Sequence, residues 1–307
     1  MSETRVSAKQ LRATFILNPA SGRATARAGR REMIEQFIAQ HQLDARLELT
    51  ARRGHATDLA RAAIAAGVQL IVSVGGDGTL NEVAAGVVGT SALYGMIPTG
   101  SGNGLGRDLG LPMDFARALA LLLDGAVRTI DTGEVCGHPF FNVMGLGFDA
   151  AIGRRFNECR GRGFFNYVQI GLRTFFAYRK ERITVEPAGA SPFVVDAFLA
   201  SVANSTQYGN NARIAPRARL DDGKLDFVAV TTRNLVAAVP LVVRLFSRSI
   251  DRSRFVRTVQ ASHFRIRRDA AGLIHTDGEI HECPAEFDVT IRARSLHVVV
   301  PPAPGAG

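Results

Sequence analysis

The sequence predicts an α/β protein with an N-terminal doubly wound parallel-sheet domain, residues 1–130, and a mostly β C-terminal domain, residues 131–307. Up to about residue 125, short apolar runs alternate with stretches of helical spacing, which is typical of a parallel sheet covered by helices. After about Arg128 the segments become β-branched and often alternate apolar with polar residues, which indicates antiparallel strands. A chain of 307 residues is long enough for both domains.

The elements of the first domain follow in order from local patterns. Apolar β-rich runs predict strands over residues 12–19, 45–51, 69–76 and 94–100. Stretches of helical spacing between them predict helices over residues 24–42, 55–67, 79–89 and 113–125. In the second domain the β-rich runs are interrupted by two helical stretches, near Phe164–Lys180 and Leu235–Phe246.

Composition describes an ordinary globular protein, with 46% hydrophobic and 21% charged residues. The longest apolar runs fall short of the roughly 18–20 residues of a membrane span, and the N-terminus lacks the apolar core of a signal peptide. Cys136, Cys159 and Cys283 show neither metal-ligand spacing nor a disulfide framework. We therefore expect no disulfide and a reducing, cytoplasmic location.

The net charge of +9 is compatible with several kinds of partner. Nucleic acid, an anionic membrane and phosphorylated small molecules would each favour a basic protein. A host proteome rich in arginine would give the same charge, so charge alone does not decide between them.

Three turns rich in glycine or serine each follow a predicted strand of the first domain, so they should lie along one edge of its sheet. They are "NPASGRA" from Asn18, "GGDGT" from Gly75 and "PTGSGNG" from Pro98. Glycine lets backbone N–H groups approach phosphate oxygens, and a helix N-terminus adds partial positive charge. The carboxylate of Asp77 would repel a phosphate unless a cation lay between them, which indicates Mg²⁺ beside nucleotide phosphates. A plain strand-to-helix turn capped by Asp77 is the alternative.

The motifs "NPASG", "GGDGTLNEV" and "PTGSGNGLGRDLGLP" resemble the catalytic domain shared by diacylglycerol kinases, sphingosine and ceramide kinases, and bacterial lipid kinases. The motifs "NVMGLGFDA", "ANSTQYGNNARIAPRARLDDGKLDFVAV" and "HTDGE" continue the resemblance in the family's order, over about residues 14–300. The resemblance implies a nucleotide-binding first domain, ATP and Mg²⁺ as cofactors, and transfer of the γ-phosphoryl group to the hydroxyl of diacylglycerol or a related lipid alcohol.

Two alternatives remain beside the lipid kinase. The Gly-Gly-Asp core alone is shared with NAD kinases, so an NAD kinase-like small-molecule kinase is the first. A non-catalytic nucleotide- or lipid-binding protein is the second.

By this resemblance, Asp77 helps to organise Mg²⁺ and water beside the transferred phosphate. The positions that match the family's ATP-contacting residues are Asn18, Ser21, Thr50, Gly75, Gly76, Asp77, Gly78, Thr79, Leu80, Asn81, Thr99, Gly100, Ser101 and Asn103.

The segment "TDGEIHE", residues 276–282, holds the expected catalytic base. In the family the glutamate of Asp-Gly-Glu accepts the proton of the acceptor hydroxyl, and this glutamate maps to Glu279. Such a base contributes roughly 10²–10⁴-fold to a rate. From the pattern alone, a β-hairpin with Asp-Gly at its tip is the alternative.

The acidic cluster in "ARLDDGKLDF" maps by resemblance to a structural Mg²⁺ site of bacterial relatives. The carboxylate of Asp222 would bind the ion together with main-chain carbonyls near Arg219 and Lys224. The adjacent Asp221 leaves the register open.

The segment Arg154–Arg182 mixes seven arginines and one lysine with aromatic residues. A basic amphipathic helix there would suit an anionic membrane surface, whereas a helix packed on the β domain is the alternative. We expect a lipid substrate at an anionic membrane surface and a cytoplasmic protein that is peripheral on the inner membrane face. No nucleic acid is expected, because no recognised RNA or DNA module is present. A homodimer is left open.

Overall fold

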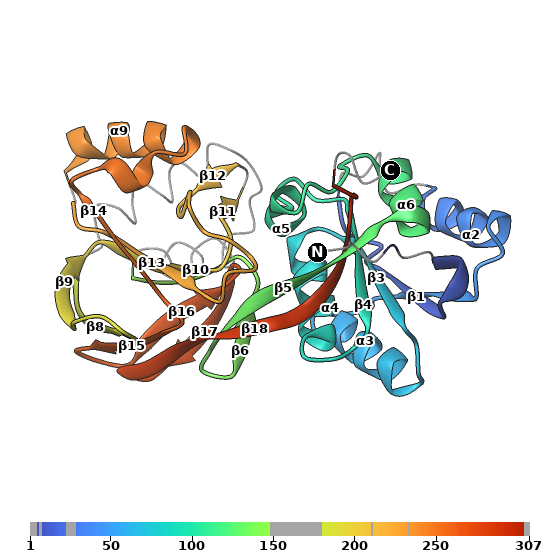
Figure 1. Ribbon diagram of the computed structural model, residues 1–307, viewed down its shortest axis with the longest axis horizontal. Helices are drawn as coiled ribbons and strands as arrows, with labels where there is room; N and C mark the ends of the chain where they lie inside the picture. Colours follow the sequence, from blue (N-terminus) through green and yellow to red (C-terminus); the bar gives the residue numbers. More distant parts are fainter. Residues whose placement is uncertain are drawn as a thin grey trace. The chain divides into compact units, whose positions relative to one another are not determined.

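The computed structural model describes residues 5, 8–22, 29–147, 180–209, 211–232 and 234–303 (Figure 1). The chain forms two compact units: Met1–Ile130 with Ala293–Gly307, and Asp131–Arg292. The second domain predicted from the sequence, residues 131–307, includes the residues after 292. They belong to unit 1 because His297 and Val298, near the end of the last strand, pair in parallel with Leu93 and Tyr94.

Unit 1 is built on a parallel sheet in the order β2-β1-β3-β4-β18. Both β1 and β3 are buried along their whole length, as expected of strands covered on both faces. The elements of this unit are η1 (Ala8–Gln10), β1 (Ala13–Leu17), α2 (Arg30–Gln40), β2 (Ala45–Leu49), α3 (His55–Ala65), β3 (Leu70–Gly75), α4 (Asp77–Val87), β4 (Leu93–Pro98), α5 (Gly104–Asp108), α6 (Phe115–Asp124), the first half of β5 (Ala126–Val135) and the end of β18 (Glu286–Val300).

Helices cover both faces of this sheet, with α3 and α4 on one side and α2 and α6 on the other (Figure 1). Tyr94 faces α4 and donates its buried hydroxyl to the carbonyl of Leu80 at 2.6 Å. Gly95, the next residue of β4, faces α6, because a Cβ there would lie 2.8 Å from the Leu122 side chain. The doubly wound fold that the sequence predicts is therefore confirmed.

Tyr94 also fixes the position of the first turn of α4. Its hydroxyl lies 2.7 Å from Ser73 Oγ in addition to its bond with the Leu80 carbonyl, and burial raises the pKa of the phenol above its ordinary value. The neutral hydroxyl thus ties α4 to β3 and β4 just beyond the point where the chain leaves β3. This contact holds the Gly-Gly-Asp turn in place.

Unit 2 is a mostly antiparallel β structure, which confirms the second part of the predicted fold class. One six-stranded sheet has the order β14-β13-β10-β7-β16-β17, and the strands β18-β15-β8-β9 form the other layer. Phe227 and Ile274 of the first layer share one buried core with Val185 and Phe264 of the second.

The bounds of the strands and helices of unit 2 are the second half of β5, β6 (His138–Phe140), β7 (Val143–Gly147), β8 (Glu181–Pro187), β9 (Phe193–Ala197), β10 (Leu199–Ala203), β11 (Gln207–Gly209), β12 (Ala212–Arg213), β13 (Leu225–Val230), α9 (Leu235–Phe246), η2 (Ile250–Arg252), β14 (Val256–Ala261), β15 (His263–Arg268), β16 (Gly272–Thr276), β17 (Glu279–Cys283) and the start of β18. The helix expected over Leu235–Phe246 is confirmed as α9. The helix expected near Phe164–Lys180 lies outside the described residues, apart from Lys180.

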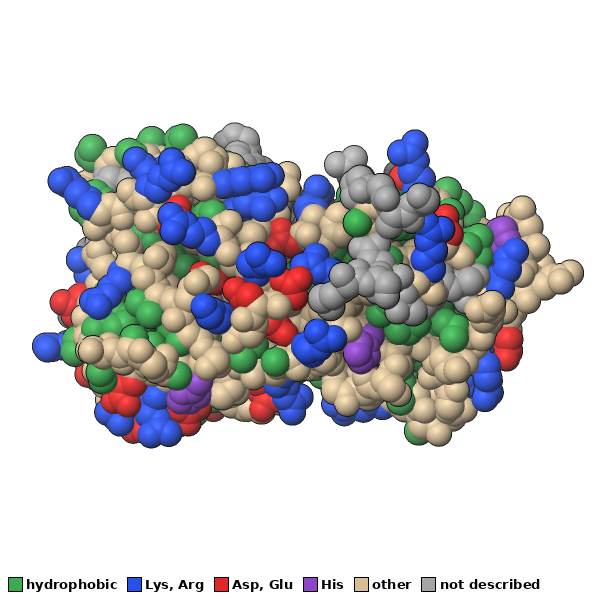
Figure 2. All heavy atoms as spheres, viewed as in Figure 1, with side chains coloured by type: hydrophobic (Ala, Val, Ile, Leu, Met, Phe, Trp, Pro, Cys, Tyr) green, Lys and Arg blue, Asp and Glu red, His purple; other side chains and the backbone are tan. Residues whose placement is uncertain are grey.

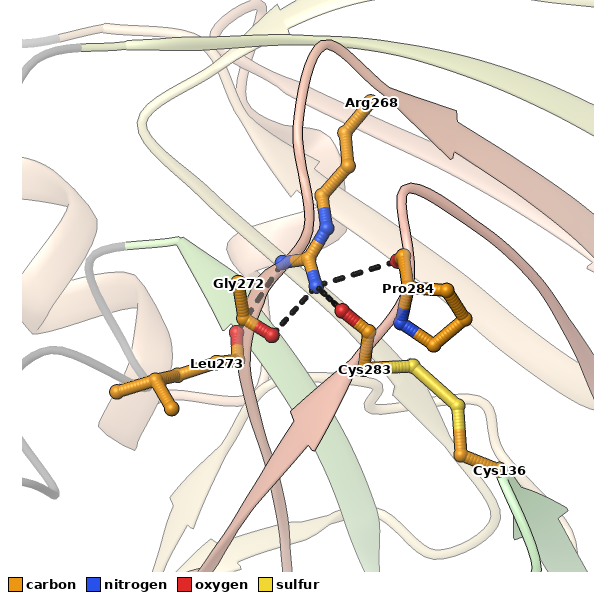
Figure 3. The surroundings of a disulfide bond; sticks show 6 residues. All are labelled: Cys136, Arg268, Gly272, Leu273, Cys283 and Pro284. Carbon is orange, nitrogen blue, oxygen red and sulfur yellow. Dashed lines mark hydrogen bonds between the residues drawn. A yellow bond between two sulfur atoms is a disulfide. The ribbon is translucent and has the colours of Figure 1, made fainter.

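A disulfide joins Cys136 to Cys283, with 6.5 Å between their Cα atoms (Figure 3). The expectation that the cysteines form no disulfide is therefore wrong for this pair. The two residues are 147 positions apart. They meet only because β5 ends at Val135 and β17 ends at Cys283 in the folded sheets, and no local pattern encodes this meeting.

The buried guanidinium of Arg268 holds the backbone beside this disulfide (Figure 3). It donates to the carbonyl of Gly272 at 2.6 Å and to that of Cys283 at 2.8 Å. Gly272 begins β16, Cys283 ends β17, and the two residues are paired in the sheet. A buried charge needs such partners to offset its lost hydration. The ends of β15, β16 and β17 are thus fixed together.

Candidate active site

The turns after β1, β3 and β4 meet at the carboxyl edge of the unit 1 sheet. The N–H of Asn18 donates to the carbonyl of Val74 at 3.1 Å, and the N–H of Thr99 donates to the carbonyl of Gly75 at 2.7 Å. The hydroxyls of Ser21 and Thr99 lie 3.0 Å apart. In the strand order β2-β1-β3-β4, this edge includes the point between β1 and β3 where ligands of doubly wound sheets bind.

Asp77 joins the turn after β3 to the turn after β4. Its Oδ2 accepts the N–H of Asn103 at 2.8 Å, and its Oδ1 accepts the N–H of Gly104 at 2.9 Å. The carboxylate is partly exposed. Each oxygen therefore keeps a second lone pair for a further partner.

The glycines of these two turns allow their backbones to approach closely. A Cβ on Gly100 would lie 2.8 Å from the Cα of Gly76, and a Cβ on Gly102 would lie 2.5 Å from Oδ2 of Asp77. Any side chain at either position would push the turns apart. The glycines are thus required for the bonds that Asp77 makes.

Helix α4 begins at Asp77 and presents its N-terminus at this edge. Gly76 stands at the N-cap and has no side chain to occupy the first amides of the helix. Gly78 is exposed, and a Cβ there would meet no atom within 4 Å. An eleven-residue helix with an open first turn and a glycine in it fits an anionic group such as a phosphate.

The other residues predicted to contact ATP lie at or beside the same edge. The N–H of Thr50 donates to the carbonyl of Leu17 at 3.0 Å, which places Thr50 just after β2. The buried Thr79 accepts a bond from the side chain of Asn18 at 3.0 Å. Asn81 is partly exposed on α4, and Ser101 is exposed in the turn after β4. The structure therefore brings these residues to one edge, whereas Leu80 of the predicted set is buried, at 3% exposure.

Asn103 uses its side chain within the turn itself. Its Oδ1 accepts the N–H of Gly100 at 3.2 Å, and its Nδ2 donates to the Gly100 carbonyl at 2.8 Å. The residue is buried and has a positive φ of 54°. The geometry gives Asn103 a positioning role, and its contact with ATP stays a prediction.

The segment "TDGE" forms a two-residue hairpin between β16 and β17, so the pattern-based alternative is correct for the backbone. Asp277 and Gly278 both have positive φ, 50° and 88°, and Thr276 pairs with Glu279. Glu279 is the exposed first residue of β17. The hairpin and the predicted role of Glu279 are compatible, because the turn presents that carboxylate to solvent.

Asp277 anchors this hairpin to β7. Its carboxylate accepts the N–H groups of Phe141 at 2.7 Å and of Asn142 and Val143 at 2.9 Å. Burial raises the pKa of the Asp277 carboxyl above its ordinary value, and the three backbone donors partly offset that shift. All three of these bonds hold the fold.

A buried polar network that was not predicted from the sequence supports the same hairpin. Asn204 donates its Nδ2 to the carbonyls of Asp131 at 2.9 Å and Phe141 at 3.0 Å. The Ser205 hydroxyl donates to Oδ1 of Asn142 at 2.9 Å. Asn204 and Ser205 lie in the motif "ANST", which carries the family resemblance but does not by itself predict this positioning role.

The loop around Asp222 is closed by its own hydrogen bonds. Oδ1 of Asp222 accepts the N–H of Lys224 at 3.1 Å, whereas Arg219 pairs with Asp221 at 3.5 Å. Asp131 accepts the N–H of Gly223 at 2.8 Å from the neighbouring β5. Among the described residues, no three His, Cys, Asp or Glu side chains gather as metal ligands. A Mg²⁺ held by Asp222 and main-chain carbonyls stays a prediction.

Comparison with known proteins finds family matches over most of the chain. Residues 12–135 match the model of the diacylglycerol kinase catalytic domain, and residues 142–300 match the YegS C-terminal NAD kinase beta sandwich-like domain. The chain belongs to this family of bacterial lipid kinases. It is accordingly a kinase, as the sequence predicts.

Several relatives of this family are similar over most of their length. The chain is 27% identical to a protein named diacylglycerol kinase from Bacillus subtilis, over 94% of this chain and 96% of that protein. It is 34% identical to a probable lipid kinase YegS-like from Pseudomonas aeruginosa, over 67% of this chain and 69% of that protein.

Solved structures show the same fold. A crystal structure of a diacylglycerol kinase from Bacillus anthracis superposes with a TM-score of 0.72 at 19% identity, over 98% of this chain and 99% of that one. The yeast NADH kinase complexed with NADH superposes with a TM-score of 0.52 at 12% identity, over 95% of this chain and 84% of that one. The Gly-Gly-Asp turn shared with NAD kinases thus lies in a shared fold.

The predicted membrane segment Arg154–Arg182 falls almost entirely outside the described residues, which include only its last three positions. In the described part of the chain, no helix has both the length and the apolar character needed to cross a bilayer.

Proposed function

We propose that this kinase is an ATP- and Mg²⁺-dependent lipid kinase that transfers the γ-phosphoryl group to the hydroxyl of diacylglycerol or a related lipid alcohol. The meeting of three turns at one sheet edge, joined by Asp77, is the observation that supports it best. The open N-terminus of α4 lies at this edge, and it would bind nucleotide phosphates. Phosphoryl transfer relies on positioning and charge stabilisation, which such fixed backbone donors provide.

The residues at this edge also suit a Mg²⁺ ion. Asp77 is partly exposed, and each of its oxygens accepts only one backbone N–H, so both oxygens keep a lone pair for a hard cation. Bound Mg²⁺ would neutralise charge on the phosphates of ATP. The bonds from Asn103 and Gly104 hold the carboxylate in one orientation before the ion arrives.

Glu279 would act on the acceptor hydroxyl. As the lipid oxygen bonds to the γ-phosphorus and the bond to the bridging β–γ oxygen breaks, the hydroxyl proton passes to the Glu279 carboxylate and ADP leaves. The exposed position of Glu279 on a fixed hairpin supports this role. Asp277 supports it indirectly, because it holds the turn that carries Glu279.

The proposed setting is cytoplasmic, with the protein peripheral on the inner membrane face and its lipid substrate in an anionic bilayer. The basic segment Arg154–Arg182 is proposed to contribute to docking there. We propose no nucleic-acid partner, and we retain a homodimer as an arrangement to test by sedimentation.

The direct test is turnover of labelled ATP with a total lipid extract and with dispersed short-chain diacylglycerol, with and without a chelator of Mg²⁺. The proposal expects a labelled phospholipid that disappears when Mg²⁺ is removed. Labelled NADP formed from NAD, with no labelled lipid, would establish the NAD kinase-like alternative. Binding without turnover of either acceptor would establish the non-catalytic alternative.

Gly78→Ala tests whether phosphates approach the first turn of α4. The methyl group meets no atom of the protein, and alanine favours a helix, so the melting temperature should stay level or rise. The KM for ATP should nevertheless rise about tenfold or more, because the methyl group would occupy the space of a phosphate oxygen. An unchanged KM for ATP would place the nucleotide elsewhere.

A further inference from the structure

Helix α9 is apolar on two opposite sides. Leu241, which is 8% exposed, and Leu245 pack into a core cluster of unit 2 that includes Val228 and Ile250. A helix needs only one such side to be held against its domain. The apolar residues on the remaining surface of α9 are therefore not explained by the packing of unit 2.

The second side of α9 is exposed. Val236 is 81% exposed, Val239 67%, Val243 62% and Phe246 57%, at spacings of three, four and three residues that form one stripe along the helix. Val242, 54% exposed, widens it. Figure 2 shows these side chains as a row of apolar atoms over the position of α9 in Figure 1.

This concentration is unusual for a protein surface. Nine large hydrophobic residues are exposed in the described part of the chain, and five of them belong to α9. Single exposed apolar residues are normal, but a contiguous group marks a surface that contacts something apolar. The exposed stripe of α9 should therefore have a partner.

The charges beside the stripe are almost all positive. Residues 234–250 contain no Asp or Glu, and the segment 244–257 carries five arginines: Arg244, Arg248, Arg252, Arg254 and Arg257. Its one acid, Asp251, pairs with a further arginine, Arg217, at 2.9 Å. Arg248, Arg252 and Arg254 are exposed, and blue side chains lie next to the apolar row in Figure 2.

An apolar stripe with an arginine rim matches the two layers of an anionic membrane surface. Valine and phenylalanine side chains enter the boundary of the acyl chains, while arginines contact phosphate groups. A second copy of this chain is a poorer match, because a two-fold contact would bring one arginine rim against another. The twelve residues of α9 would extend about 18 Å, which suits a helix lying in the interface rather than across it.

We propose that the exposed side of α9 and the arginines of residues 244–254 form a docking surface for an anionic phospholipid bilayer. This inference rests on the proposed function, since a kinase acting on a bilayer lipid must reach its surface. The residues of this docking surface lie outside the segment Arg154–Arg182 in the sequence. It provides apolar insertion at valines and Phe246 and electrostatic attraction at the arginines.

The chain contains no tryptophan, so a single introduced tryptophan is a specific reporter. We would compare Phe246→Trp with Met33→Trp, a control residue that is 41% exposed on α2 of unit 1. Each protein is mixed, without nucleotide, with vesicles of phosphatidylcholine alone or with phosphatidylglycerol. The expected result is a blue shift, and quenching by brominated lipid, for residue 246 with phosphatidylglycerol and neither effect for residue 33.

Three outcomes of this experiment would overturn the proposal: no shift at residue 246, equal shifts at both positions, or an equal response to neutral vesicles. A blue shift at residue 246 that grows with protein concentration in buffer alone would also overturn it. That result would assign the stripe to an interface between copies of the chain.

Charge and apolar variants separate the two parts of the surface. Val239→Asp with Val243→Asp should lower co-sedimentation with anionic vesicles at least tenfold, whereas Val194→Asp, at a residue 48% exposed on β9, should not. Arg248→Gln with Arg252→Gln should weaken vesicle binding about 30-fold at low salt, from about 1 kcal/mol per arginine. Arg61→Gln with Arg117→Gln, at exposed positions of unit 1, is the matched control.

Activity distinguishes a failure of docking from a failure of the proposed function. The apolar pair should lose phosphorylation of diacylglycerol in vesicles and keep that of dispersed short-chain diacylglycerol. If none of these variants loses vesicle binding, the proposed docking surface is overturned and the proposed kinase function is unaffected. A wild-type protein that binds vesicles but phosphorylates no lipid would overturn the proposed function instead.

Discussion

Asp77 and Asp277 lie in two Asp-Gly turns that look alike in the sequence but differ in their surroundings. Each carboxylate binds backbone N–H groups of a segment distant along the chain, Asn103 and Gly104 for Asp77 and Phe141–Val143 for Asp277. Each therefore fixes one turn against another. The two carboxylates differ in their capacity to accept a further partner.

Asp77 accepts two N–H groups, stays partly exposed and is the first residue of a helix. Each of its oxygens therefore keeps one lone pair for a ligand that arrives from solvent. Asp277 is also partly exposed as a whole residue, but its carboxyl accepts three N–H groups, desolvation raises its pKa, and it closes a hairpin. The comparison teaches that the same dipeptide can leave a carboxylate open to a further partner or commit it to the fold. Desolvation of the carboxyl and the number of accepted bonds decide which.

The largest effect is expected for Asp77→Ala. Removal of the carboxylate takes away the proposed contact with Mg²⁺ and the bonds to Asn103 and Gly104, so kcat/KM should fall roughly 10³-fold or more. Asp124→Ala, at an exposed residue that ends α6, is the control and should keep normal activity. The measurement is steady-state turnover on dispersed lipid, with circular dichroism to show that the variant is folded. Retention of more than about a tenth of wild-type turnover would contradict the role.

Glu279→Gln should give the next largest effect. The amide keeps the shape of the side chain and cannot accept the proton, so kcat should fall roughly 10²–10⁴-fold while ATP affinity stays the same. Glu282→Gln, at an exposed residue of the same strand β17, is the matched control. Separate measurements of kcat and ATP binding decide the point. Lost ATP binding with a normal kcat at saturation would contradict the role of Glu279 as the base.

Asp277→Ala should act on stability first. The substitution leaves three buried N–H groups without their acceptor, so the free energy of unfolding should fall by about 3 kcal/mol or more. Asp277→Asn should also destabilise, because its amide group would face the donating N–H of Phe141. Urea unfolding of both variants is the measurement. An unfolding free energy within about 0.5 kcal/mol of wild type would show that Asp277 is not the anchor of the hairpin.

Much of unit 1 could be predicted because its signals are local. A continuous apolar run that stops at Gly75 and Gly76, followed by helical spacing, predicts a buried strand, a turn and a helix without knowledge of the rest of the chain. The three turns could then be placed at one edge, because parallel strands end on the same side. The bonds of Asp77 to Asn103 and Gly104 could not, since they depend on how two turns pack.

Less of unit 2 could be predicted from the sequence, because its contacts are non-local. The Cys136–Cys283 disulfide joins residues 147 positions apart, and the return of His297 and Val298 to the sheet of unit 1 depends on tertiary pairing. For α9 the pattern predicted a helix at the right residues. It could not show which of two apolar sides is buried, because the side with Leu241 and Leu245 and the side with the valines and Phe246 are both apolar.

A third carboxylate, Asp288, extends the comparison to a group held by side chains instead of backbone. It lies on β18, where it accepts bonds from Arg265 at 3.0 Å and His263 at 2.8 Å. The hydrogen bond from Arg265 is the main reason that the pKa of Asp288 is lowered from its ordinary value. The side chain is 45% exposed, so water and salt screen these contacts.

Asp288→Asn should therefore have the smallest effect, a fall of at most about 2 °C in melting temperature at neutral pH. A lowered pKa in the folded state stabilises the protein above the unfolded pKa, and this contribution is lost as pH falls through the folded value. The difference between variant and wild type should thus be present near pH 7 and shrink towards about pH 3 and in high salt. Thermal melts across pH and salt provide the measurement. A loss as large as that of Asp277→Ala, or one independent of salt, would show that flexible side-chain donors hold a carboxylate as firmly as fixed backbone N–H groups do.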